Sequence, residues 1–373
     1  MQNAATPCAD GASFPADRPA RVIAHSRLAA GETPSRRFGR LPRADGKFVP
    51  MSAAHDPGSD GRRTVSVLIP SWRRPDLLRR VLASLPSQQH QPDEVLVVVR
   101  EDDAPSREVV AEALGVPVRE VLVTKPGLVA ARNAGLDAAT GDIVVFLDDD
   151  AVPETDWLER MLAHYDEPGV GAVGGRDRVF HDGVPTDEGD RSDVGTLTWY
   201  GRFVALHHRG AGEARDVHHL KGVNMSFDRS KCPDIRVDTS LQGKGAEVHE
   251  DASVSLQVLR RGLRVIYDPA VRVDHFEASR DDGDPRAPVE FRARRDRQHN
   301  QTFVVVRYFP LHRAAVHLLF TILVGTSDAP GVIITIRNLL RTRTVKRQFA
   351  PFLANVQGRV AGTRTALGLR RKG

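Results

Sequence analysis

The chain has 373 residues, 40% hydrophobic and 27% charged, which is a composition typical of a folded protein that can bury a sizeable core. Its net charge is +5, with 53 Lys and Arg against 48 Asp and Glu. The two distant cysteines, Cys8 and Cys232, exclude a disulfide framework and a cysteine-based zinc site, and the first residues lack the basic start and apolar run of a signal peptide.

The first part of the chain predicts a disordered lead followed by a parallel sheet. Residues 1–62 are rich in Ala, Pro, Gly, Arg and Ser and have little periodicity, so we expect them to be mostly disordered. Residues 65–70 form an apolar run that ends in Pro, residues 75–85 carry apolar side chains at helical spacing, and residues 94–99 are again apolar throughout. Two buried strands joined by a helix are typical of a parallel sheet covered on both sides.

The same alternation of strands and helices continues as far as residue 147. We predict a helix at 106–114, a strand at 118–123, a helix at 127–139 and a buried strand at 143–147. Ligands of open α/β sheets bind outside the carboxyl ends of the strands, so polar residues there mark a candidate site. Four segments follow strands in this way: Pro70 to Arg73, Glu101 to Asp103, Lys125 to Gly127, and Asp148 to Asp150.

The three adjacent carboxylates Asp148, Asp149 and Asp150 need a cation at the mouth of a buried strand, because they repel one another. Mg²⁺ or Mn²⁺, held by oxygen ligands and completed by phosphate oxygens, is the simplest partner. The alternative is a polar loop in which one Asp caps the helix that begins at Trp157. The chain has neither a Gly-x-Gly-x-x-Gly motif nor a P-loop lysine motif, which argues against a dinucleotide-binding dehydrogenase and a P-loop nucleotidase.

The second half of the sheet is less regular in sequence. Residues 171–175 and 176–180 are predicted as two strands, and residues 181–195 as a Gly-rich acidic loop over the site. Residues 220–227 form an apolar strand that contains Gly222 and Asn224. His249-Glu250-Asp251 opens an amphipathic helix, for which capping by carboxylates is a sufficient structural reason.

These motifs resemble the family 2 glycosyltransferases of the GT-A fold. The likeness covers about residues 64–276, and it rests on Val65 to Arg74, Lys125 to Gly135, Phe146 to Asp150, Glu250-Asp251 and Arg260 to His275. It implies an α/β fold, with a mostly parallel nucleotide-binding sheet flanked by helices in a catalytic domain at 63–276. It also implies an inverting, metal-dependent enzyme that moves a sugar from a nucleotide-sugar donor, expected to be a UDP-sugar, to a hydroxyl of a glycan, lipid-linked or other acceptor.

The resemblance also implies roles for individual residues. Asp251 would be the general base and Glu250 would position the acceptor. Asp148 and Asp150 would hold Mn²⁺ or Mg²⁺, with His275 as a third ligand. Arg132, together with Lys125, would meet uracil or phosphate, although a solvated helix charge is the alternative for Arg132.

The remaining donor-binding residues implied by the resemblance surround this group. Asp148 and Asp149 would share ribose and metal-water contacts. The Gly-x-Asn strand would line the acceptor side of the donor sugar, although a plain core strand is its alternative. Many relatives have an acidic residue directly after the second strand, where this chain has Arg100, so the base contact stays open among Glu101, Asp102 and Asp103. The full set is Pro70, Ser71, Arg73, Glu101, Asp103, Lys125, Arg132, Asp148, Asp149, Gly222 and Asn224.

The C-terminal region, 277–373, is predicted to be helical and basic after a charged linker at 277–288. A helix is expected at 289–306, and the apolar segment 314–325 is shorter than the roughly 20 residues that span a bilayer. No acidic residue follows Asp328, whereas ten Lys and Arg do. We therefore expect a cytoplasmic protein attached peripherally to the inner face of the cell membrane through anionic headgroups, and no nucleic-acid partner. The alternative is that these helices form a homodimer or pack on the catalytic domain.

Two other functions compete with this interpretation. A sugar-nucleotidyltransferase has similar needs for phosphate and metal, but it requires a Gly-rich loop after the first strand, where this chain has Ser71 to Arg74. A non-catalytic module that binds sugar nucleotides or membranes would bind the donor without turnover.

Overall fold

The structure is a computed structural model that describes residues 62–181, 183–186, 189–245, 247–276, 291–342 and 345–371. The predicted disordered lead, apart from residue 62, and the predicted linker at 277–288 lie outside the described residues.

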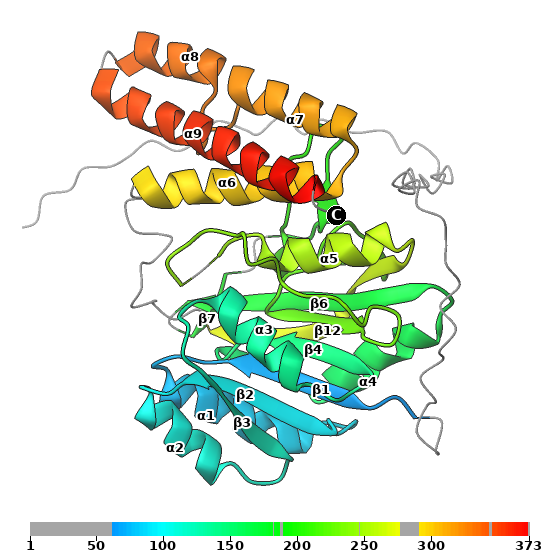
Figure 1. Ribbon diagram of the computed structural model, residues 1–373. Coiled ribbons are helices and arrows are strands. Elements are labelled where there is room, and N and C mark those ends of the chain that lie inside the picture. The colour runs from blue at the N-terminus through cyan, green and yellow to red at the C-terminus, as the bar shows by residue number, and fades with distance from the viewer. Residues whose placement is uncertain are drawn as a thin grey trace, which may run out of the picture. The chain divides into compact units, whose positions relative to one another are not determined.

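The first half of the sheet is parallel, as the sequence predicts. Strand β1 pairs with both β2 and β4, and β2 pairs with β3, all in parallel register. Their carboxyl ends therefore share one edge of the sheet (Figure 1). The elements are β1 (Val65–Pro70), α1 (Pro75–Ser84), the short 3₁₀ turn Leu85–Ser87, β2 (Glu94–Arg100), α2 (Ala104–Glu112), β3 (Val118–Val123), α3 (Leu128–Ala138) and β4 (Ile143–Leu147).

The second half of the sheet is mixed. Strand β11 runs antiparallel between β4 and β6, and β12 runs parallel to β6 on its other side. The two strands predicted at 171–175 and 176–180 are one continuous strand. At the predicted break, between Gly175 and Arg176, the extra residues lie in the partner β12, between Asp268 and Arg272. The elements are β5 (Ala151–Pro153), α4 (Trp157–Ala163), the turn His164–Asp166, β6 (Val170–His181), β7 (Val184–Pro185), β8 (Thr196–Leu197), β9 (Phe203–Val204), the turn His207–Arg209, β10 (Arg215–Asp216), β11 (Asn224–Asp228), α5 (Glu250–Arg260) and β12 (Arg264–Phe276).

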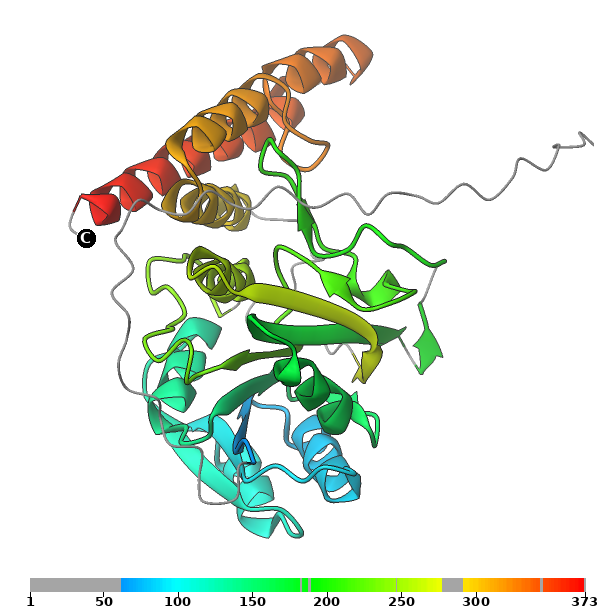
Figure 2. The same ribbon diagram turned by 90° about the vertical axis from the view of Figure 1, so that its right-hand side faces the viewer.

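Helices cover both faces of the sheet. Alternate residues of the strands point to opposite faces, so Leu68 packs with α3 and α5 in one core cluster, and Val67 packs with α1, α2 and α4 in another. Figure 2 shows α3 and α5 on one side of the sheet and α1 on the other. This confirms the predicted α/β sheet flanked by helices.

The described part of the C-terminal region, 291–342 and 345–371, contains four helices, which confirms the prediction of a helical extension. They are α6 (Phe291–Tyr308), α7 (Leu311–Leu323), α8 (Val332–Thr342) and α9 (Val345–Arg370). Helix α9 lies along α6 (Figure 1), and two glycines permit this approach, since a Cβ at Gly362 would lie 2.3 Å from the carbonyl oxygen of His299 and one at Gly358 2.4 Å from that of Arg295. Among the helices described, none joins the length and the apolar content that a bilayer crossing requires.

Candidate active site

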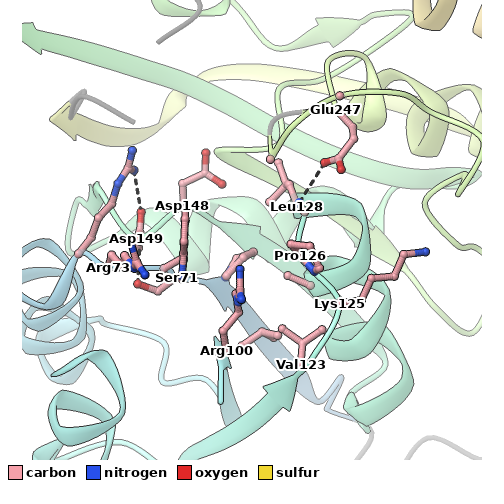
Figure 3. Close-up of a pocket in the computed structure, with 18 of the residues that line it drawn as sticks. Ser71, Arg73, Arg100, Val123, Lys125, Pro126, Leu128, Asp148, Asp149 and Glu247 are labelled. Carbon is pink, nitrogen blue, oxygen red and sulfur yellow. Dashed lines mark hydrogen bonds and ion pairs between the residues drawn. The ribbon is translucent and has the colours of Figure 1, made fainter. Parts of the chain in front are cut away.

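A pocket of about 630 Å³ opens where the parallel strands end. Figure 3 shows Asp148 and Asp149 on one side of it, Lys125 and Glu247 on the other, and Arg100 at the end of β2. The wall after β4 is acidic, whereas the other walls carry several cations. The charged lining residues are Arg73, Arg74, Arg100, Lys125, Lys244, Glu247 and Asp148 to Asp150.

Asp149 is buried against the end of β1. Its carboxylate accepts a hydrogen bond from Ser71 Oγ at 2.8 Å and forms an ion pair with Arg74, whose Nη1 lies 3.2 Å away. Burial and the neighbouring charge of Asp150 together raise the pKa of Asp149 to about 7, against the opposing effect of Arg74. Arg74 also pairs with Asp150, whose Oδ2 lies 3.1 Å from Nη1, so one guanidinium serves two of the three carboxylates.

His275 reaches Asp150 because β12 pairs with β5, which places His275 opposite Ala151. His275 Nε2 lies 3.3 Å from Asp150 Oδ1, and its Nδ1 lies 3.5 Å from the buried Asp177. Burial alone would lower the pKa of His275, but the adjacent carboxylates of Asp150 and Asp177 raise it to about 9. Asp177 also pairs with Lys221. The structure thus brings together Asp150 and His275, both predicted as metal ligands.

Arg132 connects the acidic wall to the start of α5. Its side chain is 1% exposed, so it is not the solvated helix charge that was the alternative. Nη2 lies 3.1 Å from Asp148 Oδ1, and Nη1 pairs with Glu250. Burial raises the pKa of Glu250 to about 8, with Arg132 acting against this and the charges of Asp251 and Asp148 adding to it. Arg132 lies behind the pocket, since it is not among the residues that line it.

Gly222 and Asp251 complete this network. The backbone N–H of Gly222 donates to Asp251 Oδ2 at 3.3 Å, and Asp251 Oδ1 accepts from the N–H of Ala252 at 2.6 Å. A Cβ at position 222 would lie 2.2 Å from Arg132 Nη1, so the absence of a side chain there makes room for the guanidinium. Asp251 is not among the pocket-lining residues, but it is linked to the acidic wall through Gly222 and Arg132.

Several predicted donor-binding residues lie elsewhere. Asp103 caps α2, accepting from Ser106 N at 3.4 Å and from Arg73 N at 2.5 Å. Asn224 is buried and bonds to Trp157, Arg176 and Val271. Neither Asp103, Asn224 nor the exposed Glu101 lines the pocket, whereas Pro70, Ser71, Arg73 and Lys125 do.

The pocket also contains residues that the sequence analysis did not single out as site residues. Glu247 accepts from the N–H groups of Leu128 at 3.0 Å and Val129 at 3.3 Å, so it caps α3 from a distant part of the chain. Trp72 lies beside Arg73 and Arg100, and its Nε1 is buried with no hydrogen-bond partner among the described residues. Trp72 and Arg74 could have been predicted from the sequence, because they belong to the run Ser71-Trp72-Arg73-Arg74 that follows a predicted strand. No sequence pattern pointed to Glu247.

A complete metal cage is not formed by protein alone. Within the described ranges, no three His, Cys, Asp or Glu side chains are arranged to hold a metal ion. Asp148 and Asp150 nevertheless offer the oxygen atoms that hard divalent ions prefer, and Mg²⁺ in particular is usually bound by one or two carboxylates with substrate phosphates completing its coordination. The chemistry of these residues therefore fits an ion that binds together with a diphosphate.

Comparison with known proteins accounts for this arrangement. Residues 66–232 match the model of glycosyl transferase family 2. This segment is a family 2 glycosyltransferase domain. The match confirms the prediction that the chain carries a domain of this enzyme class.

Two curated glycosyltransferases are similar in sequence to this chain. The chain is 28% identical over 303 residues to the pre-mycofactocin glycosyltransferase of Mycobacterium tuberculosis strain CDC 1551, covering 73% of this chain and 59% of that protein. It is 33% identical over 156 residues to the glucosyl-dolichyl phosphate glucuronosyltransferase of Haloferax volcanii, covering 40% of this chain and 47% of that protein. The chain thus matches only about half of the length of these relatives.

A solved structure confirms the fold around the family 2 domain. S. aureus TarS 1-349, in complex with UDP-GlcNAc, superposes with a TM-score of 0.53 at 15% identity, covering 83% of this chain and 92% of that one. The predicted GT-A-like fold is therefore confirmed.

Proposed function

We propose that this protein is an inverting glycosyltransferase that moves a sugar from a UDP-sugar donor to a hydroxyl of a glycan, lipid-linked or other acceptor. The observation that carries the proposal is the pocket at the carboxyl edge of the sheet, where an acidic wall faces several cations. A nucleotide diphosphate that binds with a metal ion requires both kinds of wall, because its phosphates need positive charge and the metal ion needs carboxylates.

The donor would lie across the ends of β1 to β4. Arg74, Arg100 and Lys125 supply positive charge near the diphosphate. Trp72 lines the pocket and offers an aromatic surface for the base. In this proposal Arg100, at the end of β2, takes part in base binding, since none of Glu101, Asp102 and Asp103 lines the pocket.

Asp148 and Asp150, with His275 beside Asp150, would hold Mn²⁺ or Mg²⁺. When bound, such an ion neutralises the negative charge that grows on the leaving diphosphate. Arg132 keeps Asp148 in place from behind the wall, because it is buried and pairs with that carboxylate at 3.1 Å. Arg74 balances the charge of the acidic wall before the donor arrives.

Asp251 would act as the general base on the acceptor hydroxyl, and Glu250 would position the acceptor side of the site. The link between Asp148 and Glu250 through Arg132 supports this assignment, since it brings the start of α5 next to the acidic wall. Removal of the hydroxyl proton while the anomeric carbon is attacked from the face opposite the diphosphate inverts its configuration. The backbone N–H groups of Gly222 and Ala252 hold the carboxylate of Asp251 in one orientation.

A screen of nucleotide sugars tests this proposal. Thermal unfolding and release of UDP are measured with and without Mn²⁺ for the parent chain, Asp150→Ala and the surface control Asp137→Ala. We expect a UDP-sugar with Mn²⁺ to stabilise the parent and the control, and to release UDP, but not to stabilise Asp150→Ala. Equal stabilisation of all three proteins in the presence of metal would overturn the assignment of the ion to this wall.

We also propose that the C-terminal helices bind an anionic membrane surface. Ile333, Ile336 and Leu340 of α8 are 57%, 52% and 79% exposed, and their spacing places them on one side of the helix. Arg337 and Arg341 are exposed on the same helix. An exposed apolar stripe with basic neighbours is the pattern of a helix that lies in the headgroup region of a bilayer.

Sedimentation with lipid vesicles tests this second proposal. The parent is expected to bind vesicles that contain phosphatidylglycerol and not vesicles of phosphatidylcholine alone. An Ile336→Glu, Leu340→Glu double variant should lose binding, whereas the control Leu114→Glu, at a position 84% exposed outside these helices, should keep it. Unchanged binding by the double variant, or a stable dimer in solution that the double variant abolishes, would refute the membrane assignment.

A further inference from the structure

A second cavity lies on the other side of the start of α5. It has a volume of about 130 Å³, and it is bounded by the segment around Tyr200 to Arg202, by His249, and by helices α6, α7 and α9. At the share of about 30 Å³ that one water occupies in the liquid, this is room for roughly four waters or one phosphate group. His249 immediately precedes Glu250, so the cavity and the proposed catalytic residues share the N-terminus of α5.

Arg359 of α9 is the charged group at the base of this cavity. It is 2% exposed, and its guanidinium donates to four side chains. The acceptors are Asn355 Oδ1 at 3.0 Å, Thr302 Oγ1 at 2.9 Å, His317 Nε2 at 3.2 Å and Gln298 Oε1 at 2.5 Å. Burial lowers the pKa of His317 to about 3, so its ring is neutral and accepts this bond. All four partners of Arg359 are therefore neutral.

A buried guanidinium without a counter-charge is unusual, because leaving water costs several kcal/mol unless a negative charge compensates. The chain has no acidic residue after Asp328, so the helix that carries Arg359 supplies none. Asp328 is the one carboxylate among the described residues that line the cavity, and it is an exposed residue on the loop between α7 and α8. Among the described residues, Arg359 makes no ion pair with a carboxylate.

Apart from the exposed Asp328, the other charged side chains among the described residues that line the cavity are cations. Arg202 and Arg297 line it, and Gln301 and the amide of Gln298 add neutral N–H groups. Burial lowers the pKa of His249 to about 3, and the charges of Arg297 and Arg359 act in the same direction. The described lining residues therefore carry more positive than negative charge and include several donors, and the cavity has the size of a small oxyanion.

We propose that this cavity binds a phosphate group, with Arg359 and Arg297 as its charged ligands. Charge-assisted hydrogen bonds from two guanidinium groups are the usual means of holding a phosphate in a protein. The site is separate from the donor pocket, because the two cavities have no lining residue in common. The phosphate is either a free ion or the phosphoryl group of an organic ester, and the proposal does not depend on the glycosyltransferase activity.

Thermal unfolding with titrated anions tests the proposal. Sodium phosphate is compared with sodium chloride at equal ionic strength, and glycerol phosphate is titrated separately. We expect saturable stabilisation by phosphate, weakened about tenfold or more in Arg297→Gln, since one charge-assisted hydrogen bond is lost. Arg359→Gln should lose the effect altogether. The control Arg364→Gln, on the exposed side of α9, should respond as the parent does.

Two further comparisons keep the outcome clear. Arg74→Gln changes the donor pocket and not this cavity, so it should keep the phosphate response; if it loses the response, the anion binds at the donor site and the proposal is overturned. If Arg359→Gln fails to fold, Arg297→Gln decides, because an unchanged response in that variant also overturns the proposal. Equal stabilisation by glycerol phosphate identifies an ester as an acceptable ligand, whereas stabilisation by inorganic phosphate alone identifies the free ion.

Discussion

Arg132 Nη2 lies 3.1 Å from Asp148 Oδ1 while its other terminal nitrogen pairs with Glu250. A single buried cation thus fixes the acidic wall of the donor pocket and the first turn of α5 relative to each other. The guanidinium also lies over the ring of Phe146, 4.7 Å from its centroid. Because the pairing depends on space at Gly222, it can be disturbed without removing any charge.

Gly222→Ala is expected to destabilise the protein by about 1–3 kcal/mol, since the new methyl group would displace the guanidinium of Arg132. Chemical denaturation measures the change, and donor affinity should fall with it because Asp148 loses its support. Gly368→Ala is the matched control, because nothing lies within 4 Å of a Cβ at that position of α9. Similar stabilities for the two variants would contradict the steric account.

Asp251→Asn is expected to keep donor binding and to lower the rate of transfer by about 10²–10⁴, the usual contribution of general base catalysis. Asn retains one oxygen that accepts the N–H of Ala252 but loses the acceptor of the Gly222 N–H, so one of the two bonds that orient the side chain is kept. The thermal shift on adding donor and metal reports binding, and release of UDP in the presence of acceptor reports turnover. Turnover equal to that of the parent would show that Asp251 is not the base.

Glu250→Gln tests the effect of burial on that carboxylate. The folded-state pKa of about 8 lies above the ordinary value of 4.5, so the folded protein keeps a proton that the unfolded chain releases. Between these two values the stability of the parent falls as pH rises, and Gln removes this dependence. The stability of Glu250→Gln relative to the parent should therefore increase from pH 4.5 to pH 8.

Chemical denaturation at several pH values measures this difference, with Glu112→Gln as a control for the loss of one negative charge at an exposed position. A relative stability of Glu250→Gln that falls over the same pH range would show that the ion pair with Arg132 outweighs burial.

Asn300→Ala is expected to weaken donor binding from a position outside the pocket. The side chain of Asn300, on α6, accepts from the N–H of Gln242 at 2.7 Å and donates to the carbonyl groups of Gln242 at 2.7 Å and Val248 at 3.0 Å. It thereby holds both ends of the segment that brings Lys244 and Glu247 to the pocket. Loss of these bonds should raise the KM for the donor more than it lowers kcat.

The matched control for Asn300→Ala is Asn355→Ala. Asn355 is equally buried and donates to the carbonyl groups of Thr321 at 3.0 Å and Pro330 at 3.2 Å, which are remote from the donor pocket. Both variants should lose stability, but only Asn300→Ala should change the KM for the donor. Equal KM values would show that Asn300 supports the fold alone.

The sequence was sufficient to predict the parallel half of the fold, because runs such as residues 94–99 and 143–147 are apolar on both faces and directly report strands covered by helices. The ends of the helices were predicted less accurately than their presence. Helix α2 begins at Ala104, two residues before the predicted start, because Asp103 caps it. That cap also explains why Asp103 does not face the pocket, and no local pattern distinguishes a capping Asp from a ligand-binding one.

The site could be predicted only where its residues follow strands. Ser71, Lys125 and Asp148 do so, and all three line the pocket. The pairing of Lys221 with Asp177 and the cap that Glu247 provides for α3 depend on contacts between distant segments, which composition and spacing do not report. Arg359 is the clearest case, since a basic residue in an acid-free tail was expected on the surface and is buried.

The hydrogen bonds that Asn300 makes to residues 242 and 248 have a consequence for how this protein can be inherited or divided. The segment that matches the family ends at residue 232, before the proposed base on α5 and before the helix that anchors residues 242–248. A gene fusion that transferred only the matched segment would carry Asp148 to Asp150 and Lys125 but leave behind Lys244 and Glu247, which complete the opposite wall. Recombination that preserves activity should therefore exchange the sheet and α6 together as a single inherited block.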